Sequence, residues 1–278
     1  MKSKNILLIN DLPGYGKVAL SAMLPILSKM GYSLYNLPTA LVSNTLDYGK
    51  FEILDTTSYM ENTITVWNEL GFQFDCISTG FILSSKQVDI ITNYIKSQNN
   101  PNLLVVVDPI MGDDGKLYNG ITQETVAHMK ELSSYADILI PNYTEAAFIA
   151  DLFTDKSSLT KSEINALIDK LVSQGSKSVV ITSIIEKDSN NHFVCGYDDK
   201  SKAYFYLPYD YIPVRFPGTG DIFSAVMVGE LLKETSLELS VKKAMDIVAR
   251  LIEKNKNSQD KFKGIFIEKD LDSILWKN

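Results

Sequence analysis

The sequence predicts an α/β protein with a mostly parallel central sheet, helices on both faces and a small β-hairpin near residues 192–207. Short β-branched runs alternate with amphipathic stretches along most of the chain. Most of the runs are apolar without polar alternation, which is the pattern of strands buried on both faces. Strands and helices in this rhythm are typical of right-handed crossovers on a mostly parallel sheet.

The elements are predicted in order along the chain. The strands are Asn5–Asn10, Ser33–Leu37, Asp75–Thr79, Leu103–Asp108, Ile138–Pro141 and Ser178–Ser183. The helices between them are Lys17–Met30, Thr57–Glu69, Lys86–Gln98, Gln123–Ser133 and Lys161–Ser173. In the last of these helices the apolar residues recur at helical spacing, and charged residues occupy the rest of the surface.

The rhythm changes after the last of these strands. The runs 192–196 and 203–207 flank a polar turn and predict the β-hairpin. The chain then returns to helices, predicted at Asp221–Lys233 and Leu239–Lys254. No repeat and no linker rich in Pro or Gly divides the chain, so residues 1–278 are predicted to form a single domain.

The composition excludes several classes of protein. The 278 residues include 27 Lys and Arg against 34 Asp and Glu, and this net charge of −7 leaves no basic surplus for binding nucleic acid. Two His and two Cys are too few and too scattered for a zinc cluster, and the low Cys content fits a reducing compartment. The apolar runs are too short for a membrane span or a signal peptide, so a soluble cytoplasmic protein is expected. With His this scarce, carboxylates are the expected catalytic groups.

A glycine-containing loop follows the first predicted strand. Gly14, Gly16 and Ala19 match the Gly-x-Gly-x-x-Gly/Ala pattern of dinucleotide-binding turns. The acidic residue that such a site needs after the second strand is missing, and Val18 after Lys17 excludes a Walker loop. Two interpretations stay open: a tight strand-to-helix turn, and a loop that contacts a ligand.

Two further segments place carboxylates after strands. Asp108 ends a buried strand before a loop of Pro and Gly, where it would either serve a cation or cap the next turn. Asn142 and Glu145 follow the strand that ends at Pro141, and a capping box at the start of a helix explains their spacing by itself.

A second glycine-containing segment precedes an apolar helix. Gly218, Thr219 and Gly220 allow the amides of the first helical turn to point at an anion. Asp221 lies where its carboxylate would accept a proton from a substrate hydroxyl beside that anion. The alternative is that Asp221 is simply the helix N-cap.

The carboxylates Asp108, Glu145 and Asp221 all lie at strand ends or helix starts, which gather along one edge of a doubly wound sheet. Phosphoryl transfer needs this set of groups: acids that hold a metal, amides for the moving phosphoryl group and a base for the acceptor.

The sequence resembles the ribokinase-like kinases, and within them the pyridoxal (vitamin B6) kinases. The segments that resemble the family's signature and its further motifs are PGTGDIFSA at 217–225, VDPIMGDDGKLY at 107–118 and PNYTEA at 141–146. LPTALVSNTLDYG at 37–49 and STGFILS at 78–84 are similar to segments that mark the B6 branch. The resemblance implies a homodimeric, ATP-dependent kinase that phosphorylates the 5′-hydroxymethyl group of pyridoxal, pyridoxine or pyridoxamine.

The resemblance also implies roles for single residues. Asp221 would be the general base, and the amides from Gly218 to Gly220 would form the anion hole for the γ-phosphoryl group of ATP. The residues implied in nucleotide and metal binding are Asp108, Asn142, Glu145 and Thr182. Of these, Asp108 and Glu145 would organise Mg²⁺, and relatives often use a monovalent cation such as K⁺ as well.

The residues implied in contacting or covering the pyridine ring are Asp11, Thr39, Ser43, Asn44, Tyr48 and Phe81. Asp11 stands where many B6 kinases have Ser, and Phe81 where Tyr is common. A carboxylate at position 11 would bind the ring nitrogen, the ring hydroxyl or an amine such as that of pyridoxamine, so the preferred vitamer stays open. The alternatives are a hydroxymethylpyrimidine kinase or another ribokinase-like small-molecule kinase and, outside the enzymes, a nucleotide- or vitamer-binding sensor.

Overall fold

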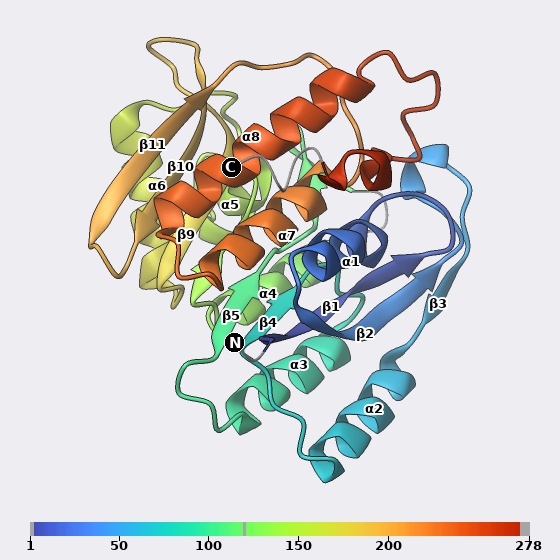
Figure 1. Ribbon diagram of the computed structural model, residues 1–278. Coiled ribbons are helices and arrows are strands. Elements are labelled where there is room, and N and C mark those ends of the chain that lie inside the picture. Colours follow the sequence, from blue (N-terminus) through green and yellow to red (C-terminus); the bar gives the residue numbers. More distant parts are fainter. Residues whose placement is uncertain (1–2, 119–120, 273–278) are drawn as a thin grey trace. The chain divides into compact units, whose positions relative to one another are not determined.

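The computed structural model describes residues 3–118 and 121–272 and contains two compact units (Figure 1). Unit 1 consists of residues 1–78, 99–103 and 212–278. Unit 2 consists of residues 79–98 and 104–211. The single domain 1–278 stays a prediction, and its residues 1–2, 119–120 and 273–278 lie outside the described residues.

Unit 1 holds the first and last parts of the chain. Its elements are β1 (Asn5–Pro13), α1 (Ala19–Lys29), β2 (Ser33–Val42), a short 3-10 helix (Leu46–Tyr48), β3 (Ile53–Asp55), α2 (Thr57–Glu69), β4 (Cys76–Thr79), α7 (Thr219–Leu231), α8 (Leu237–Asn255) and a second 3-10 helix (Ile267–Lys269). The strands follow the order β4-β1-β2-β3, with β1 and β2 parallel and β2 and β3 antiparallel. The helices α1 and α7 lie on one face of these strands and α2 lies on the other (Figure 1).

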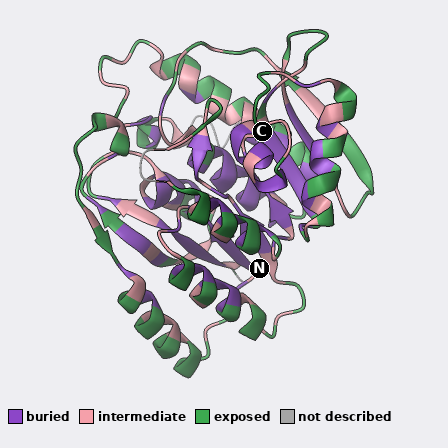
Figure 2. Cartoon of the chain, turned by 180° about the vertical axis from the view of Figure 1, so that it is seen from behind, coloured by how far each residue is buried: buried purple, intermediate pink, exposed green. Residues whose placement is uncertain are grey.

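The core of Unit 1 forms around β1 and α7. The side chains from Ile6 to Ile9 are fully buried because both faces of β1 are covered, which explains the apolar run without alternation. Helix α7 is buried continuously from Asp221 to Glu230 and packs against α1 and α8, so it is apolar on nearly every side. Figure 2 shows this contrast between buried central elements and helices that are exposed on their outer faces.

Unit 2 holds the middle of the chain. Its elements are α3 (Ser85–Ser97), β5 (Leu104–Val107), β6 (Gly112–Asp113), β7 (Lys116–Leu117), α4 (Gln123–Ser133), β8 (Ile138–Leu139), α5 (Tyr143–Ala150), α6 (Lys161–Ser173), β9 (Ser178–Ile185), β10 (His192–Asp198) and β11 (Ala203–Tyr209). The order is β11-β10-β9-β8-β5, parallel from β5 to β9 and antiparallel from β9 to β11, with β6 and β7 forming a separate small ribbon. The predicted hairpin and the predicted α/β class with a mostly parallel sheet are confirmed.

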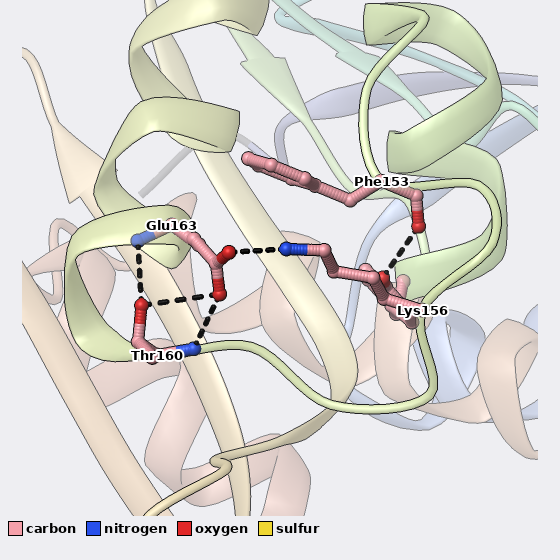
Figure 3. A network of polar contacts seen from close by, with 5 residues as sticks. Phe153, Lys156, Thr160 and Glu163 are labelled. Carbon is pink, nitrogen blue, oxygen red and sulfur yellow. Dashed lines mark hydrogen bonds and ion pairs between the residues drawn. The ribbon is translucent and has the colours of Figure 1, made fainter.

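Helix α6 shows how local sequence sets a helix start (Figure 3). Thr160 and Glu163 form a capping box, in which the Thr160 N–H donates to Glu163 Oε2 at 2.9 Å and the Glu163 N–H donates to Thr160 Oγ1 at 3.4 Å. Lys156 completes the network with an ion pair to Glu163, and its hydrogen bond lowers the pKa of that carboxyl to about 2.

Element boundaries depart from the predictions where polar residues or prolines interrupt a run. Strand β1 continues three residues beyond the predicted end at Asn10, and β2 continues from Leu37 to Val42, because main-chain pairing between the two strands carries both onward. Strand β8 ends earlier than predicted, at Leu139, before Pro141, which has no N–H for a sheet bond. No helix within 3–118 or 121–272 has the length and apolar character needed to span a membrane.

Candidate active site

Asp221 lies in the first turn of α7, three residues after the N-cap Gly218. Its carboxylate is 8% exposed and accepts hydrogen bonds from the Asn10 amide at 3.3 Å and from the Ala19 N–H. Burial raises the pKa of the Asp221 carboxyl to about 6, and the two donors limit this rise because they bind the ionised form. Asp221 is therefore not the N-cap, and its pKa suits a general base working near neutral pH.

The turn before α7 is packed tightly against the turn that follows β1. Gly218 has a φ of +85°, and a Cβ on it would overlap the carbonyl oxygen of Lys17. Gly16 has a φ of +109°, and a Cβ there would overlap the side chain of Thr45. Both positions need glycine for backbone conformation and for close approach. The first glycine loop is thus a tight strand-to-helix turn, one of its two sequence interpretations.

Thr219 and Gly220 open helix α7. The Thr219 hydroxyl donates to the carbonyl oxygen of Phe216 at 3.2 Å and anchors the turn. A Cβ on Gly220 would meet no atom within 4 Å, so there is open space beside this residue. The first amides of a helix lack intrahelical acceptors and carry the positive end of its dipole. The turn therefore offers space and N–H donors to an anion.

Asp11 lies on β1 itself and not on the loop after it. The pairing with β2 shifts register between Asn10 and Leu12, so Asp11 lies opposite the part of β2 between Pro38 and Leu41, which includes the buried Thr39. Burial, and after it the negative charge of Asp221, raise the pKa of the Asp11 carboxyl to about 7. Unit 1 thus brings together the predicted base and one predicted ring-contacting carboxyl, and both titrate near neutral pH.

The loop after β2 carries three more of the residues predicted to contact the ring. The Ser43 hydroxyl donates to Asn44 Oδ1 at 2.7 Å, and Asn44 Nδ2 donates to the carbonyl oxygen of Lys50 at 2.9 Å. The Tyr48 hydroxyl donates to Asp260 Oδ2 at 2.6 Å and leaves the tyrosine 37% exposed. These bonds brace the loop internally and against the C-terminal segment, so the three side chains are held in one place on Unit 1.

Glu145 joins the start of α5 to the loop after β5. One carboxylate oxygen accepts the Asn142 N–H at 2.9 Å, and the other accepts the Met111 N–H at 3.0 Å. The Glu145 N–H in turn donates to Asn142 Oδ1 at 3.0 Å, which completes the capping box that the spacing predicts. Asn142 also donates from Nδ2 to the Gly112 carbonyl oxygen at 2.7 Å. The capping box therefore fixes the loop after β5 as well as the start of α5.

Asp108 is the second carboxyl of this cluster. Burial, and after it the charge of Asp108, raise the pKa of Glu145 well above its usual range. Thr182 on β9 forms a parallel β-bridge with Asn142, in which the Thr182 N–H donates to the Pro141 carbonyl oxygen at 3.0 Å. Unit 2 therefore brings together all four residues predicted for nucleotide and metal binding, whereas Phe81 follows β4 as a half-buried side chain.

Replacing Glu145 with glutamine is expected to destabilise the protein and to lower its activity. The single amide oxygen of glutamine cannot accept at both ends, so the new NH₂ faces either the Asn142 or the Met111 N–H. A buried donor left unsatisfied costs about 1–3 kcal/mol. Thermal unfolding measures the loss of stability, and steady-state turnover measures the effect on the loop after β5.

Glu163 provides the matched control, because it occupies the same capping-box position on α6 at a half-buried site (Figure 3). Glutamine is an ordinary partner in a capping box. Glu163→Gln should keep wild-type activity and lose less thermal stability than Glu145→Gln. Equal losses in the two variants would refute the special role of Glu145.

Sequence reasoning did not assign a role to Asn10 or to the backbone N–H of Ala19, both of which contact Asp221. The available signal is that Asn10 is the polar residue ending an otherwise apolar strand, where a side chain that is 2% exposed needs a hydrogen-bonding partner. Ala19 has a φ of +47°, a backbone feature that no residue type reveals.

Comparison with known proteins places the chain in a family. The family model described as phosphomethylpyrimidine kinase matches residues 24–265. A solved structure from Bacteroides thetaiotaomicron, described as a phosphomethylpyrimidine kinase with pyridoxal, is 34% identical with a TM-score of 0.94, covering 100% of this chain and 97% of its own. The pyridoxal kinases of Arabidopsis thaliana and Dictyostelium discoideum are each 30% identical, over 75% and 69% of this chain. The chain spans 68% of the Arabidopsis protein and 66% of the Dictyostelium protein.

The fold, the family model and the full-length structural relative define an enzyme, a ribokinase-like kinase. The chain belongs to the phosphomethylpyrimidine kinase family, and its relatives include pyridoxal kinases. The predicted kinase class and the resemblance to the ribokinase-like family are confirmed.

Proposed function

We propose that this kinase transfers the γ-phosphoryl group of ATP to the 5′-hydroxymethyl group of pyridoxal, pyridoxine or pyridoxamine. The observation that carries the proposal is the buried Asp221, with its pKa near 6, directly after the open turn formed by Gly218, Thr219 and Gly220. A relative that is 34% identical over the full chain is described with pyridoxal, which supports the choice of acceptor.

In this proposal Asp221 removes the proton of the acceptor hydroxyl as the oxygen attacks phosphorus. The amides of the α7 first turn receive the charge on the transferred group, where fixed donors stabilise it without reorganisation. Because Asp221 is buried, its carboxylate is poorly solvated and accepts a proton more readily than an exposed aspartate would.

The residues Asp108 and Glu145 fit a magnesium ion. Each carboxylate disfavours ionisation of the other, and a divalent cation would relieve that repulsion. The described parts of the chain contain no group of three or more His, Cys, Asp or Glu side chains that would hold a metal unaided. Mg²⁺ commonly keeps water and substrate phosphates as ligands, and when bound it neutralises phosphate charge. Asn142 and Thr182 are proposed to contact the phosphates. A monovalent cation such as K⁺ is proposed as a second ion.

The vitamer is proposed to contact Asp11 and Thr39, with Ser43, Asn44 and Tyr48 covering the ring from the braced loop, and Phe81 packing on it. Near neutral pH the Asp11 carboxyl exists in both protonation states, since its pKa is about 7. It is thus able to donate to a ring oxygen or to accept from a protonated ring nitrogen or amine.

An acceptor panel tests the proposal. ADP release, measured in a coupled assay with ATP and Mg²⁺, should be highest with one of the three B6 vitamers. The family description names a phosphomethylpyrimidine kinase, so hydroxymethylpyrimidine, the alternative acceptor of the same ring class, belongs in the same panel with a simple sugar. Turnover confined to the pyrimidine or the sugar would overturn the B6 assignment while preserving the kinase class.

A cytoplasmic homodimer is part of the proposal. Both cysteines are buried thiols that form no disulfide, which fits a reducing compartment. The edge strand β3 and the segment before it expose Phe51 at 43% and Leu54 at 60%, and a strand edge of this kind offers unpaired main-chain groups to a second chain. Sedimentation of the intact protein would measure the oligomeric state.

A further inference from the structure

Asn10 is a buried polar side chain in the core of Unit 1. It follows the apolar residues of β1 and is 2% exposed. Its Nδ2 donates to Asp221 Oδ1 at 3.3 Å, and its Oδ1 accepts the Asp11 N–H at 2.9 Å. One amide therefore contacts the candidate base and the backbone of the second candidate carboxyl.

Asn10 is the donor in its hydrogen bond with Asp221. The amide NH₂ is only a donor, so it favours the ionised, proton-accepting form of Asp221. The Ala19 N–H donates to the same carboxylate from the start of α1. The negative charge of Asp221 in turn raises the pKa of the neighbouring Asp11 carboxyl. The Asn10 amide thus opposes the effect of burial on the pKa of Asp221.

We propose that Asn10 is a positioning residue for phosphoryl transfer, whose amide holds the Asp221 carboxylate oriented and ionised while fixing the backbone at Asp11. The inference rests on the proposed function of Asp221 as the base. It assigns a role in turnover to a side chain on β1 that is expected to touch neither ATP nor the acceptor.

Asn10→Asp is the sharpest test, because the shape is kept while the donor is lost and a negative charge is added beside Asp221. The new side chain still accepts the Asp11 N–H, but it presents an oxygen to Asp221 in place of the NH₂. The acidic limb of the pH profile of kcat/KM should move upward by about one unit, which is about a tenfold loss of activity below the limb. Activity should recover toward the wild-type value at alkaline pH, where the Asp221 carboxyl is ionised despite its new neighbour.

Met23→Leu is the matched control, because the Met23 sulfur also contacts Asn10 Nδ2, at 3.7 Å, without touching the carboxylate in question. It should leave the pH profile in place. Asn10→Ser is the second variant if a third carboxylate prevents folding, as judged by thermal unfolding. Its shorter hydroxyl withdraws from Asp221, so kcat should fall more than KM changes.

Each variant is assayed with whichever acceptor the panel identifies, so failure of the B6 assignment does not decide this inference. An Asn10→Asp or Asn10→Ser profile that superimposes on the wild type, while Asp221→Ala is inactive, would overturn the role of Asn10. If Asp221→Ala itself keeps full turnover, the proposed base is wrong and the proposed function fails first.

Discussion

Asp221→Ala should lower kcat by about 10²–10⁴-fold, the usual contribution of a general base. The side chain is buried, its pKa lies near 6, and the anion-binding turn immediately precedes it. Alanine removes the proton acceptor but leaves the main-chain amides of α7 in place. Binding of ATP, measured by calorimetry, should therefore be largely retained while steady-state turnover is lost.

The pH dependence of the wild-type enzyme is a second test of Asp221 as the general base. Because Asp221 must be ionised to accept a proton, and its pKa is about 6, kcat/KM should fall tenfold per unit as the pH drops below about 6. Glu230→Gln is the control, since Glu230 lies on the same helix but pairs with Lys233 and Lys243. Near-wild-type kcat in Asp221→Ala would refute the assignment.

Gly218→Ala should abolish most activity through the backbone. The residue has a φ of +85°, which disfavours any side chain, and the added methyl group would overlap the Lys17 carbonyl oxygen. Neither obstacle is the flexible end of a side chain, so the turn must move and carry the first amides of α7 with it. We expect lower thermal stability together with loss of turnover.

Gly220→Ala separates the two effects, because a methyl group there meets no protein atom within 4 Å. This variant should unfold at nearly the wild-type temperature, whereas its effect on KM for ATP reports on the open space at the turn. If Gly218→Ala were as stable as Gly220→Ala, the close packing of the two turns would not constrain the site.

Local sequence was a good guide wherever the determining contacts are local. The helices 57–69, 123–133 and 161–173 were predicted with their observed bounds, because the apolar periodicity lies within each helix and, in the last two, a capping box lies at its start. The capping box of Asn142 and Glu145 was predicted for the same reason. Strand ends were less accurate, since β2 extends beyond Leu37 through pairing with β1.

The glycine loops show where local reasoning stops. From sequence, Gly14, Gly16 and Ala19 were equally compatible with a ligand loop and with a tight turn. The choice depends on what approaches them, and Thr45 packs directly over Gly16. Asp221 was similarly open between a helix cap and a base, and the position of the N-cap at Gly218 excludes the cap, while the role as a base stays a prediction.

The sequence by itself determined the alternation of strands and helices, the scarcity of histidine and the acidic and glycine-rich segments that define a phosphoryl-transfer enzyme. Only the tertiary structure decided how the base is held. Asn10 and Asp221 are 211 positions apart, and their hydrogen bond forms because β1 and α7 pack together in Unit 1. A contact between such distant positions leaves no periodicity and no local motif in a single sequence, so its effect on the ionisation of Asp221 emerges only from the fold.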